Sequence, residues 1–475
     1  MMRPILASAL LPAAAAVAAT SMPLYAQEAP PPPPIAPLKP FQLPRSETYA
    51  LPNGMKVTLL PYGTTPKVTV DLRVFAGTLN EAGTPWAAQM TAEMLKEGAG
   101  GLTSDQIADR AADMGGRITV GAGAQMTSIS TDVLSEKAAE AVALIGAIAT
   151  RPTFPAAEWA RVKANDARSL AVSLAQAPVQ ANVVLARTYY GDAHPYGTPM
   201  PTAAQLDGYG LDTVRSFYAA NYGARRAHLY VAGRFDPVTV KAAVARAFGG
   251  WASGPERLSR PAEPKPGMQV VLVDRPDAPQ TTIRIAYPQS LAGSAGEPAQ
   301  RVGDSLYSGS FSSRLTRNLR EDKGYTYSPY SRVGYNPGDA RYVWSADITT
   351  AQTGAAMREV FDELRRLQTT APDAEETEGQ KTYVSGIFVF RNATPQSVVG
   401  TLASAENLGL PDSWISGYIP TTQAVTAGQV QDWAKGLRAD RMTLILVGDL
   451  KTVVPQLKAL PELANADLRT VPAPQ

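Results

Sequence analysis

Residues 312–330 read SSRLTRNLREDKGYTYSPY, and this stretch decides how we interpret the second half of the chain. Its first part has the pattern of an amphipathic helix, because Leu315 and Leu319 lie one turn apart and arginines occupy the polar side. Gly324 predicts the end of that helix, since the left-handed backbone conformation that closes many helices favours glycine. The β-prone segment 325–327 then predicts a strand that begins at Tyr327.

A helix, a tight glycine turn and a strand would bring Arg320 and Tyr327 to one point in space. A guanidinium and a phenol aimed together at a carbonyl oxygen form a site that stabilises an oxyanion. The residues alone leave a second interpretation open, in which the arginines are solvated on a surface helix and the tyrosine packs on a sheet.

Length and composition exclude several classes of protein. With 475 residues the chain is too long for one ordinary core and favours two domains of about 200 residues each. The formal net charge of +2, with no run of basic residues interleaved with aromatic ones, argues against nucleic-acid binding. The absence of cysteine excludes disulfides and thiolate catalysis. No glycine-rich nucleotide motif is present, and Ser308-Gly309-Ser310 resembles a nucleophile elbow only faintly.

The N-terminal residues predict export. Arg3 precedes an apolar, alanine-rich run over residues 5–19, so we interpret residues 1–26 as a signal peptide with cleavage after Ala26. Residues 27–46 are rich in proline and predict an extended tether. No later stretch of about 18 apolar residues follows, so we expect a periplasmic protein with no transmembrane segment in the mature chain.

The rest of the chain has two halves of similar plan. Residues 47–252 predict strands and then runs of helices, residues 253–267 shift to Pro, Arg and Glu as a linker, and residues 268–465 repeat the order of elements. Residues 466–475 are interpreted as a tail. Strands accompanied by runs of helices favour two α+β domains of the same fold.

Several motifs in this order resemble one family. Ser312-Ser313-Arg314-Leu315 is followed by Leu319-Arg320-Glu321, Gly324 and residues 325–328 (YTYS), with support from residues 51–54 (LPNG), 194–197 (HPYG) and the strand-Gly-Asp unit that ends at Asp449. Together they resemble the pitrilysin and mitochondrial-processing-peptidase (insulinase-like) family of zinc peptidases, over about residues 47–465. The resemblance implies two homologous domains of metallopeptidase-like (LuxS/processing-peptidase-like) fold that form half of a clam-shell.

The chain departs from this family at the zinc signature. In the family a helix of the first domain carries H-x-x-E-H, in which two histidines bind zinc and the glutamate activates water. Aligned on Gly98, the signature falls on residues 89–93, where Gln89, Ala92 and Glu93 replace both histidines and the base. The more distal ligand position offers Asp166 but no glutamate. The two histidines of the chain, His194 and His228, fall on a turn and a strand, and we interpret both as structural. We therefore expect no cofactor in this chain.

The resemblance implies a role that the chain fulfils together with a second protein. In the family an arginine and a tyrosine seven residues apart contact the substrate carbonyl and the tetrahedral oxyanion, and Arg320 and Tyr327 match that spacing. We expect a non-catalytic subunit of a heterodimeric zinc peptidase, inactive alone, whose zinc-bearing homologous partner shares a site for unfolded peptides. Two alternatives remain: a zinc-less peptide-binding or scaffold protein in which Arg320 and Tyr327 are replaceable, and an enzyme with metal at an unrecognised carboxylate cluster.

Overall fold

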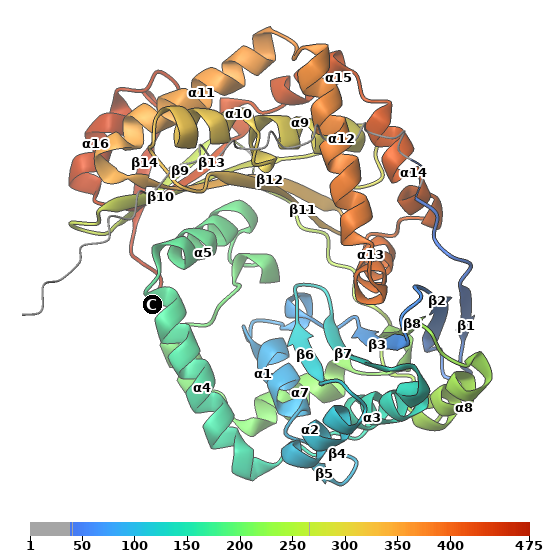
Figure 1. Ribbon diagram of the computed structural model, residues 1–475. Coiled ribbons are helices and arrows are strands. Elements are labelled where there is room, and N and C mark those ends of the chain that lie inside the picture. Colours follow the sequence, from blue (N-terminus) through green and yellow to red (C-terminus); the bar gives the residue numbers. More distant parts are fainter. Residues whose placement is uncertain (1–38, 40, 266) are drawn as a thin grey trace, which may run out of the picture. The chain divides into compact units, whose positions relative to one another are not determined.

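The computed structural model describes residues 39, 41–265 and 267–475 (Figure 1). The predicted signal peptide and most of the predicted tether lie outside the described residues. Within the described part, the chain forms two mixed sheets, each covered by helices, so the predicted α+β class with two units of the same fold is confirmed.

The first sheet is built from the first half of the chain. Its strands, in spatial order, are β1 (Glu47–Ala50), β2 (Lys56–Pro61), β8 (Ala227–Gly233), β3 (Lys67–Val74), β7 (Thr127–Leu134) and β6 (Thr119–Ala122). The accompanying helices are α1 (Ala87–Leu95), α2 (Ser104–Asp113), α3 (Ala138–Thr150), α4 (Ala156–Leu174), α5 (Ala177–Tyr190), α6 (Ala203–Asp207), α7 (Leu211–Asn221) and α8 (Pro237–Phe248). Two short strands, β4 (Gly98–Ala99) and β5 (Leu102–Thr103), pair with each other after α1.

The second sheet repeats this plan. Its strands, in the corresponding order, are β14 (Leu468–Val471), β9 (Gln269–Asp274), β13 (Thr443–Gly448), β10 (Gln280–Pro288), β12 (Asp339–Thr349) and β11 (Tyr330–Asn336). Its helices are α9 (Glu297–Asp304), α10 (Arg314–Thr316), α11 (Thr353–Thr369), α12 (Ala374–Arg391), α13 (Pro395–Asn407), α14 (Asp412–Gln423), α15 (Ala427–Lys435) and α16 (Leu450–Lys458). In both sheets a parallel pair, β2 with β8 and β9 with β13, continues into antiparallel pairs, and in the second sheet the edge strand β14 adds a further parallel pair with β9.

The central strands β8 and β13 are buried along their whole length, as residues 227–233 (AHLYVAG) and 443–448 (TLILVG). A strand that is buried along its whole length requires other elements to pack on both faces of its sheet. The first core packs α1, α3, α7 and α8 against the first sheet, and the second core packs α9, α11, α15 and α16 against the second. The remaining face of each sheet is covered by a helix from the other half.

Each half of the chain contributes a helix that covers the sheet of the other half. Helix α5 places Ala181, Val184 and Leu185 against Val271 of β9 and Val447 of β13. In the opposite direction, α13 covers the first sheet, where its apolar residues Val398, Val399 and Ala403 cluster with Leu60, Tyr230 and Ala232. Burial of apolar surface therefore joins the two halves at two places.

Four details differ from the sequence-based expectations. The helix predicted over residues 311–322 is a short α10 followed by a π-helical segment, η6 (Arg317–Asp322), because Lys323 N donates to Asn318 O (3.0 Å) across a widened turn. The strand expected from Tyr327 begins at Tyr330, since Pro329 has no N–H for the sheet.

The segment interpreted as a tail contributes β14, which pairs with β9. Helix α5 was not predicted, because it is buried nearly all round and lacks an amphipathic pattern.

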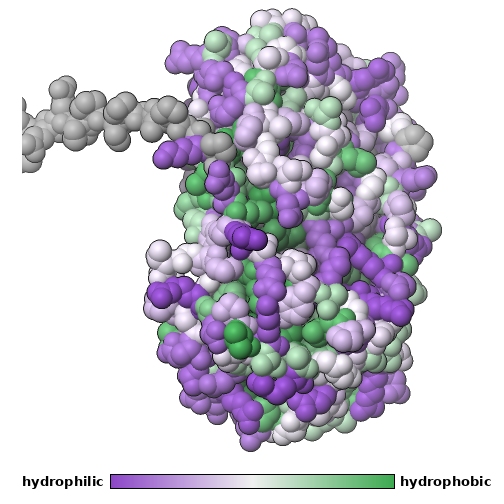
Figure 2. All heavy atoms as spheres, turned by 90° about the vertical axis from the view of Figure 1, so that its right-hand side faces the viewer, coloured by the Kyte–Doolittle hydropathy of each residue, from purple (hydrophilic) through white to green (hydrophobic). Residues whose placement is uncertain are grey.

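The last residues of the predicted tether are packed rather than extended into solvent. Phe41 meets Phe388 of α12 edge to face at 5.4 Å between ring centroids, and Leu43 joins the same apolar cluster. On the side of the molecule where α13 and α14 lie, hydrophobic residues gather across the middle of the surface (Figure 2). The predicted boundaries at residues 252–253 and 267–268 stay predictions; no described residue between Gly249 and Met268 belongs to a helix or strand.

Among the described residues, no single helix has the length and apolar character to cross a membrane. Helices α4 and α5 have that length and apolar character only when they are taken together, and the two helices meet at a bend of 92°.

Close helix packing at Gly303 generates a stability prediction. A Cβ atom at Gly303 of α9 would lie 2.2 Å from Cε3 of Trp433 on α15, so Gly303→Ala is expected to lower the free energy of unfolding by about 1–3 kcal/mol through overpacking. Gly379 of α12 has nothing within 4 Å of its Cβ position, so Gly379→Ala is expected to raise it by about 0.4–1 kcal/mol. Urea unfolding followed by circular dichroism measures both, and equal effects of the two substitutions would contradict the packing argument.

A polar contact between the halves generates a pH prediction. Glu406 of α13 accepts hydrogen bonds from His228 Nδ1 (2.6 Å), Tyr230 (2.6 Å) and Lys56 (3.1 Å). Burial raises the pKa of Glu406, but these bonds outweigh it and lower the pKa to about 2, from an ordinary value of 4.5. A folded-state pKa below the unfolded one means that the stabilisation is complete above about pH 4.5 and is lost as the pH falls towards about 2.

We therefore expect Glu406→Gln to lower the free energy of unfolding at neutral pH by about 1–3 kcal/mol and to flatten its decline between about pH 5 and pH 3. Urea titrations at a series of pH values measure this, with Glu263→Gln, an exposed glutamate, as the matched control. An unchanged acid slope in Glu406→Gln would refute the assignment.

Candidate functional site

The degenerate zinc signature lies on α1, in the first half. Gln89 and Glu93 share one helical face, and Gln89 Nε2 donates to Glu93 Oε1 at 3.2 Å. Lys96 Nζ lies 2.6 Å from the other Glu93 oxygen. Ala92, at the position of the catalytic base in the family, is fully buried. The Lys96 ammonium therefore balances the charge of Glu93.

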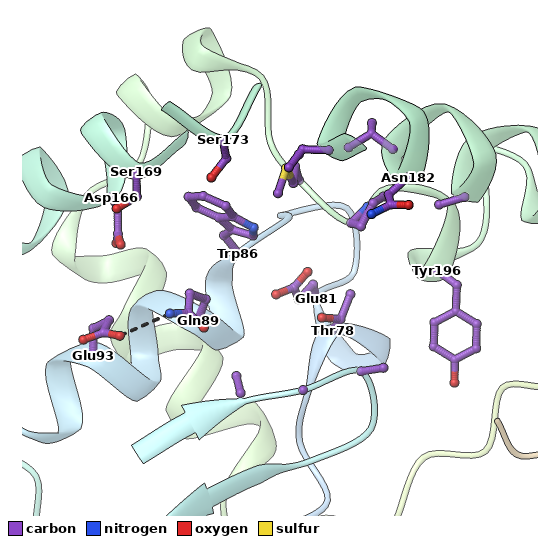
Figure 3. A pocket seen from close by; sticks show the side chains of 18 of the residues that line it. Thr78, Glu81, Trp86, Gln89, Glu93, Asp166, Ser169, Ser173, Asn182 and Tyr196 are labelled. Carbon is purple, nitrogen blue, oxygen red and sulfur yellow. Dashed lines mark hydrogen bonds between the residues drawn. The ribbon is translucent and has the colours of Figure 1, made fainter. Parts of the chain in front are cut away.

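Helix α4 faces this part of α1 with its own polar stripe. Asp166, Ser169 and Ser173 follow one another at helical spacing along the wall of the same cavity (Figure 3). Asp166 is 8% exposed, and its Oδ2 has no hydrogen-bond partner among the described residues. Burial, followed by the nearby charge of Glu93, raises the pKa of Asp166 to about 6.

The cavity has a volume of about 940 Å³, which is large enough for several residues of a peptide. Glu81 and Trp86 line it at the start of α1, and Asn336 and Arg341 line it from the second half. The Glu81 carboxylate accepts the Ala88 N–H at 3.1 Å and so caps α1, while burial raises its pKa to about 7. Sequence reasoning did not single out Glu81, Trp86 or Arg341, because only the tertiary fold brings them to α1.

The residues around this cavity do not fit a zinc ion. Zinc in proteins takes histidine, cysteinate or carboxylate ligands in a convergent set. Here one position is an amide, Glu93 is paired with Lys96, and no group of three or more such side chains is arranged to hold a metal within the described part of the chain. The two histidines lie elsewhere: His194 Nδ1 accepts the Tyr196 N–H, and His228 bonds Thr58 and Glu406.

The second candidate group lies on the π-helical turn of the second half. Ser313 caps α10 by accepting the Thr316 N–H, and Arg314 forms a bidentate pair with Glu376 of α12. The helix ends where Gly324 takes a φ of +63°, and Tyr325 N donates to Leu319 O at 2.8 Å. Arg314 is therefore held in a structural pair, whereas Arg320 projects from the last turn.

The structure brings Arg320 and Tyr327 together. The Arg320 guanidinium carbon lies 4.8 Å from the centroid of the Tyr327 ring and 4.6 Å from that of Phe311. Both rings are largely exposed, Tyr327 by 79% and Phe311 by 70%. Cation–π contacts with both rings orient the guanidinium at the protein surface. Glu321 Oε1 lies 3.4 Å from Arg320 Nε. We call Phe311, Arg320 and Tyr327 the aromatic clamp; Phe311 was not predicted as a member.

These two groups of residues do not share a cavity within this chain. None of the three clamp residues lines the pocket that contains Gln89 and Glu93. Ser308, the centre of the faint nucleophile-elbow match, is buried and bonds Ser331 (2.7 Å) and Tyr342 (2.6 Å), so it has no access to a substrate.

Comparison with known proteins agrees with the predicted relationship. Residues 210–384 match the family model described as the Peptidase M16 inactive domain. A protein of Rickettsia bellii described as an uncharacterized zinc protease is 23% identical over 300 residues, which are 60% of this chain and 70% of that protein.

Two solved structures show the same fold. The peptidase M16 inactive domain from Pseudomonas fluorescens superposes with a TM-score of 0.77 at 23% identity, over 85% of this chain and 98% of the other. A protease from Helicobacter pylori gives a TM-score of 0.78 at 16% identity, over 86% of this chain and 100% of the other. The chain is therefore similar to the M16, insulinase-like peptidases: residues 210–384 match the M16 inactive domain, and histidines are absent from residues 89–93.

Proposed function

We propose that this chain is the non-catalytic subunit of a heterodimeric, periplasmic zinc peptidase, in which Arg320 and Tyr327 complete the site of a zinc-bearing homologous partner. The observation that carries the proposal is the aromatic clamp: a guanidinium held between two exposed rings, in a chain without zinc ligands at the signature helix. Export rests on the signal peptide predicted over residues 1–26.

The chemistry assigned to the clamp follows from its donors. The Arg320 guanidinium has N–H groups that can donate to a substrate carbonyl, and the Tyr327 hydroxyl can donate to the oxyanion of the tetrahedral intermediate. The partner's zinc ion would supply the activated water. Because Arg320 is already oriented by Phe311 and Tyr327, little side-chain freedom is lost when the substrate binds.

The proposed substrates are unfolded peptides. The sheets end at β6 and β11, whose outer edges could accept an added strand through backbone hydrogen bonds. Residues 122–124, at the end of β6, also line the large cavity, so a peptide added at this edge would run beside it.

Variants of the clamp test this function. In a mixture of this chain with the zinc-bearing homologue from the same cell, Arg320→Ala and Tyr327→Phe are each expected to lower kcat by about 10²–10³-fold, the usual effect of removing one oxyanion donor. Cleavage of a fluorogenic peptide library measures this, and size-exclusion chromatography checks that the complex persists.

Matched controls are available on the same surface. Arg317 is exposed one turn earlier and Tyr330 is exposed at the start of β11, so Arg317→Ala and Tyr330→Phe are expected to retain full activity. If the homologue alone is fully active and neither this chain nor its clamp variants change the rate, the alternative of a peptide-binding or scaffold protein replaces the proposal.

Restoring ligands tests the loss of the metal site. Gln89→His, Glu93→His and Asp166→Glu together place two imidazoles on one face of α1 opposite a carboxylate of α4, so we expect this triple variant to retain about one zinc per chain after dialysis, and the native chain none. Elemental analysis measures the metal, with Gln89→His alone as the control. Stoichiometric zinc in the native chain would refute its role as the metal-free subunit.

A further inference from the structure

The cavity between α1 and α4 contains a carboxylate for which the chain provides no partner. Asp166 is more than nine-tenths buried, and no described residue donates a hydrogen bond to its Oδ2. A buried charge without a hydrogen bond is costly, and the usual remedy is a pairing group. Oδ2 itself is closed to solvent, so a group bound in the cavity, whose wall includes Asp166, would pair with the carboxylate through its other oxygen.

The neighbouring charges are already paired. Glu93 is bound by Lys96 at 2.6 Å, Glu97 forms an ion pair with Arg161, and Glu81 caps α1. Lys96 and Arg161 are thereby committed to other carboxylates. Of the acidic side chains that line the cavity, Asp166 is thus the one that has neither a paired cation nor a hydrogen-bond donor among the described residues.

The opposite end of the cavity is lined by a guanidinium. Arg341 lines it there, with its guanidinium 5.0 Å and 5.1 Å from the ring centroids of Tyr189 and Tyr190. Its Nη1 is buried without a hydrogen-bond partner among the described residues. Asp339 accepts the Tyr190 hydroxyl at 2.6 Å beside it, so this end of the cavity has charges of both signs, whereas no cation is paired with Asp166 at the α1–α4 end.

The polar atoms beside Asp166 fit an ammonium group. An ammonium has three N–H donors and needs three acceptors. Ser169 stands one turn from Asp166, and Gln89 donates its Nε2 to Glu93, which leaves its carbonyl oxygen as an acceptor towards the cavity (Figure 3). A divalent metal fits less well, because hard cations take six or more oxygen ligands and only one unpaired carboxylate is present.

We propose that the space between α1 and α4 binds a primary ammonium group of a peptide, either its N-terminus or a lysine side chain, through Asp166, Gln89 and Ser169. This site belongs to the first half of the chain and depends on neither the aromatic clamp nor a zinc-bearing partner. The remainder of the cavity, towards Tyr196 and Arg341, holds the adjoining peptide backbone.

Four peptides distinguish the two sources of the ammonium group. A decapeptide labelled with fluorescein at its C-terminus is prepared in four forms, which combine a free or an acetylated N-terminus with lysine or norleucine at the centre. Fluorescence anisotropy measures the binding of each form to the native chain alone. The peptide with neither ammonium is expected to bind at least about tenfold more weakly than the best of the others, from the loss of a charged hydrogen bond. If acetylation weakens binding, the bound ammonium group is the N-terminus; if norleucine weakens binding, it is the lysine side chain.

Asp166→Asn preserves the shape of the side chain and is expected to weaken the ammonium-bearing peptides about tenfold without changing the doubly blocked one. Asp212→Asn, at an exposed aspartate outside the cavity, is the matched control and is expected to leave all four affinities unchanged. Thermal unfolding checks that both variants remain folded.

Three outcomes would overturn the proposal: equal binding of all four peptides to the native chain, an equal loss for all four in Asp166→Asn, or Asp166-dependent binding of Zn²⁺ or Mg²⁺ in calorimetry without discrimination among the peptides. The first two outcomes leave the proposed subunit function untouched, because the clamp variants are measured separately, in the mixture with the partner. Zinc binding in the third outcome would also contradict the role of a metal-free subunit.

Discussion

The exchange of helices between the two halves is the packing interaction on which the rest of the structure depends. Helix α5 of the first half covers the second sheet, and α13 of the second half covers the first. Each central strand is buried on both faces, and the helices of its own half cover only one of them. Separation of the halves would expose both apolar faces at once, and for this reason we regard them as one stable unit.

The same exchange positions the large cavity. Helix α5 must lie on the second sheet, while α4, joined to it at a bend of 92°, is free to stand opposite α1. The sharp bend therefore fixes Asp166 across from Glu93 and lets Arg341 of the second half enter the wall. The cavity is a consequence of interdomain packing, and its charges come from three separate parts of the chain.

The residues that align with the zinc signature are held by local charge pairs and hydrogen bonds. Lys96 and Gln89 bind Glu93, and Glu81 still caps the signature helix, so α1 keeps its place without a metal ion. The aromatic clamp on the second half is independent of these contacts.

The sequence by itself determined the fold class and the repeat of two units, because strand patterns and glycine positions are local properties. The residues alone left the pairing of Arg320 with Tyr327 as one of two interpretations, and the resemblance to the family favoured it. The sequence also revealed the missing histidines. Only the tertiary structure decided the rest: α5 has no amphipathic pattern because it is buried on nearly all sides, Phe311 joins Arg320 across a π-helical turn, and Asp166 meets Glu93 only because α4 folds back over α1. Contacts between residues far apart in sequence depend on packing of complete elements, which no local pattern encodes.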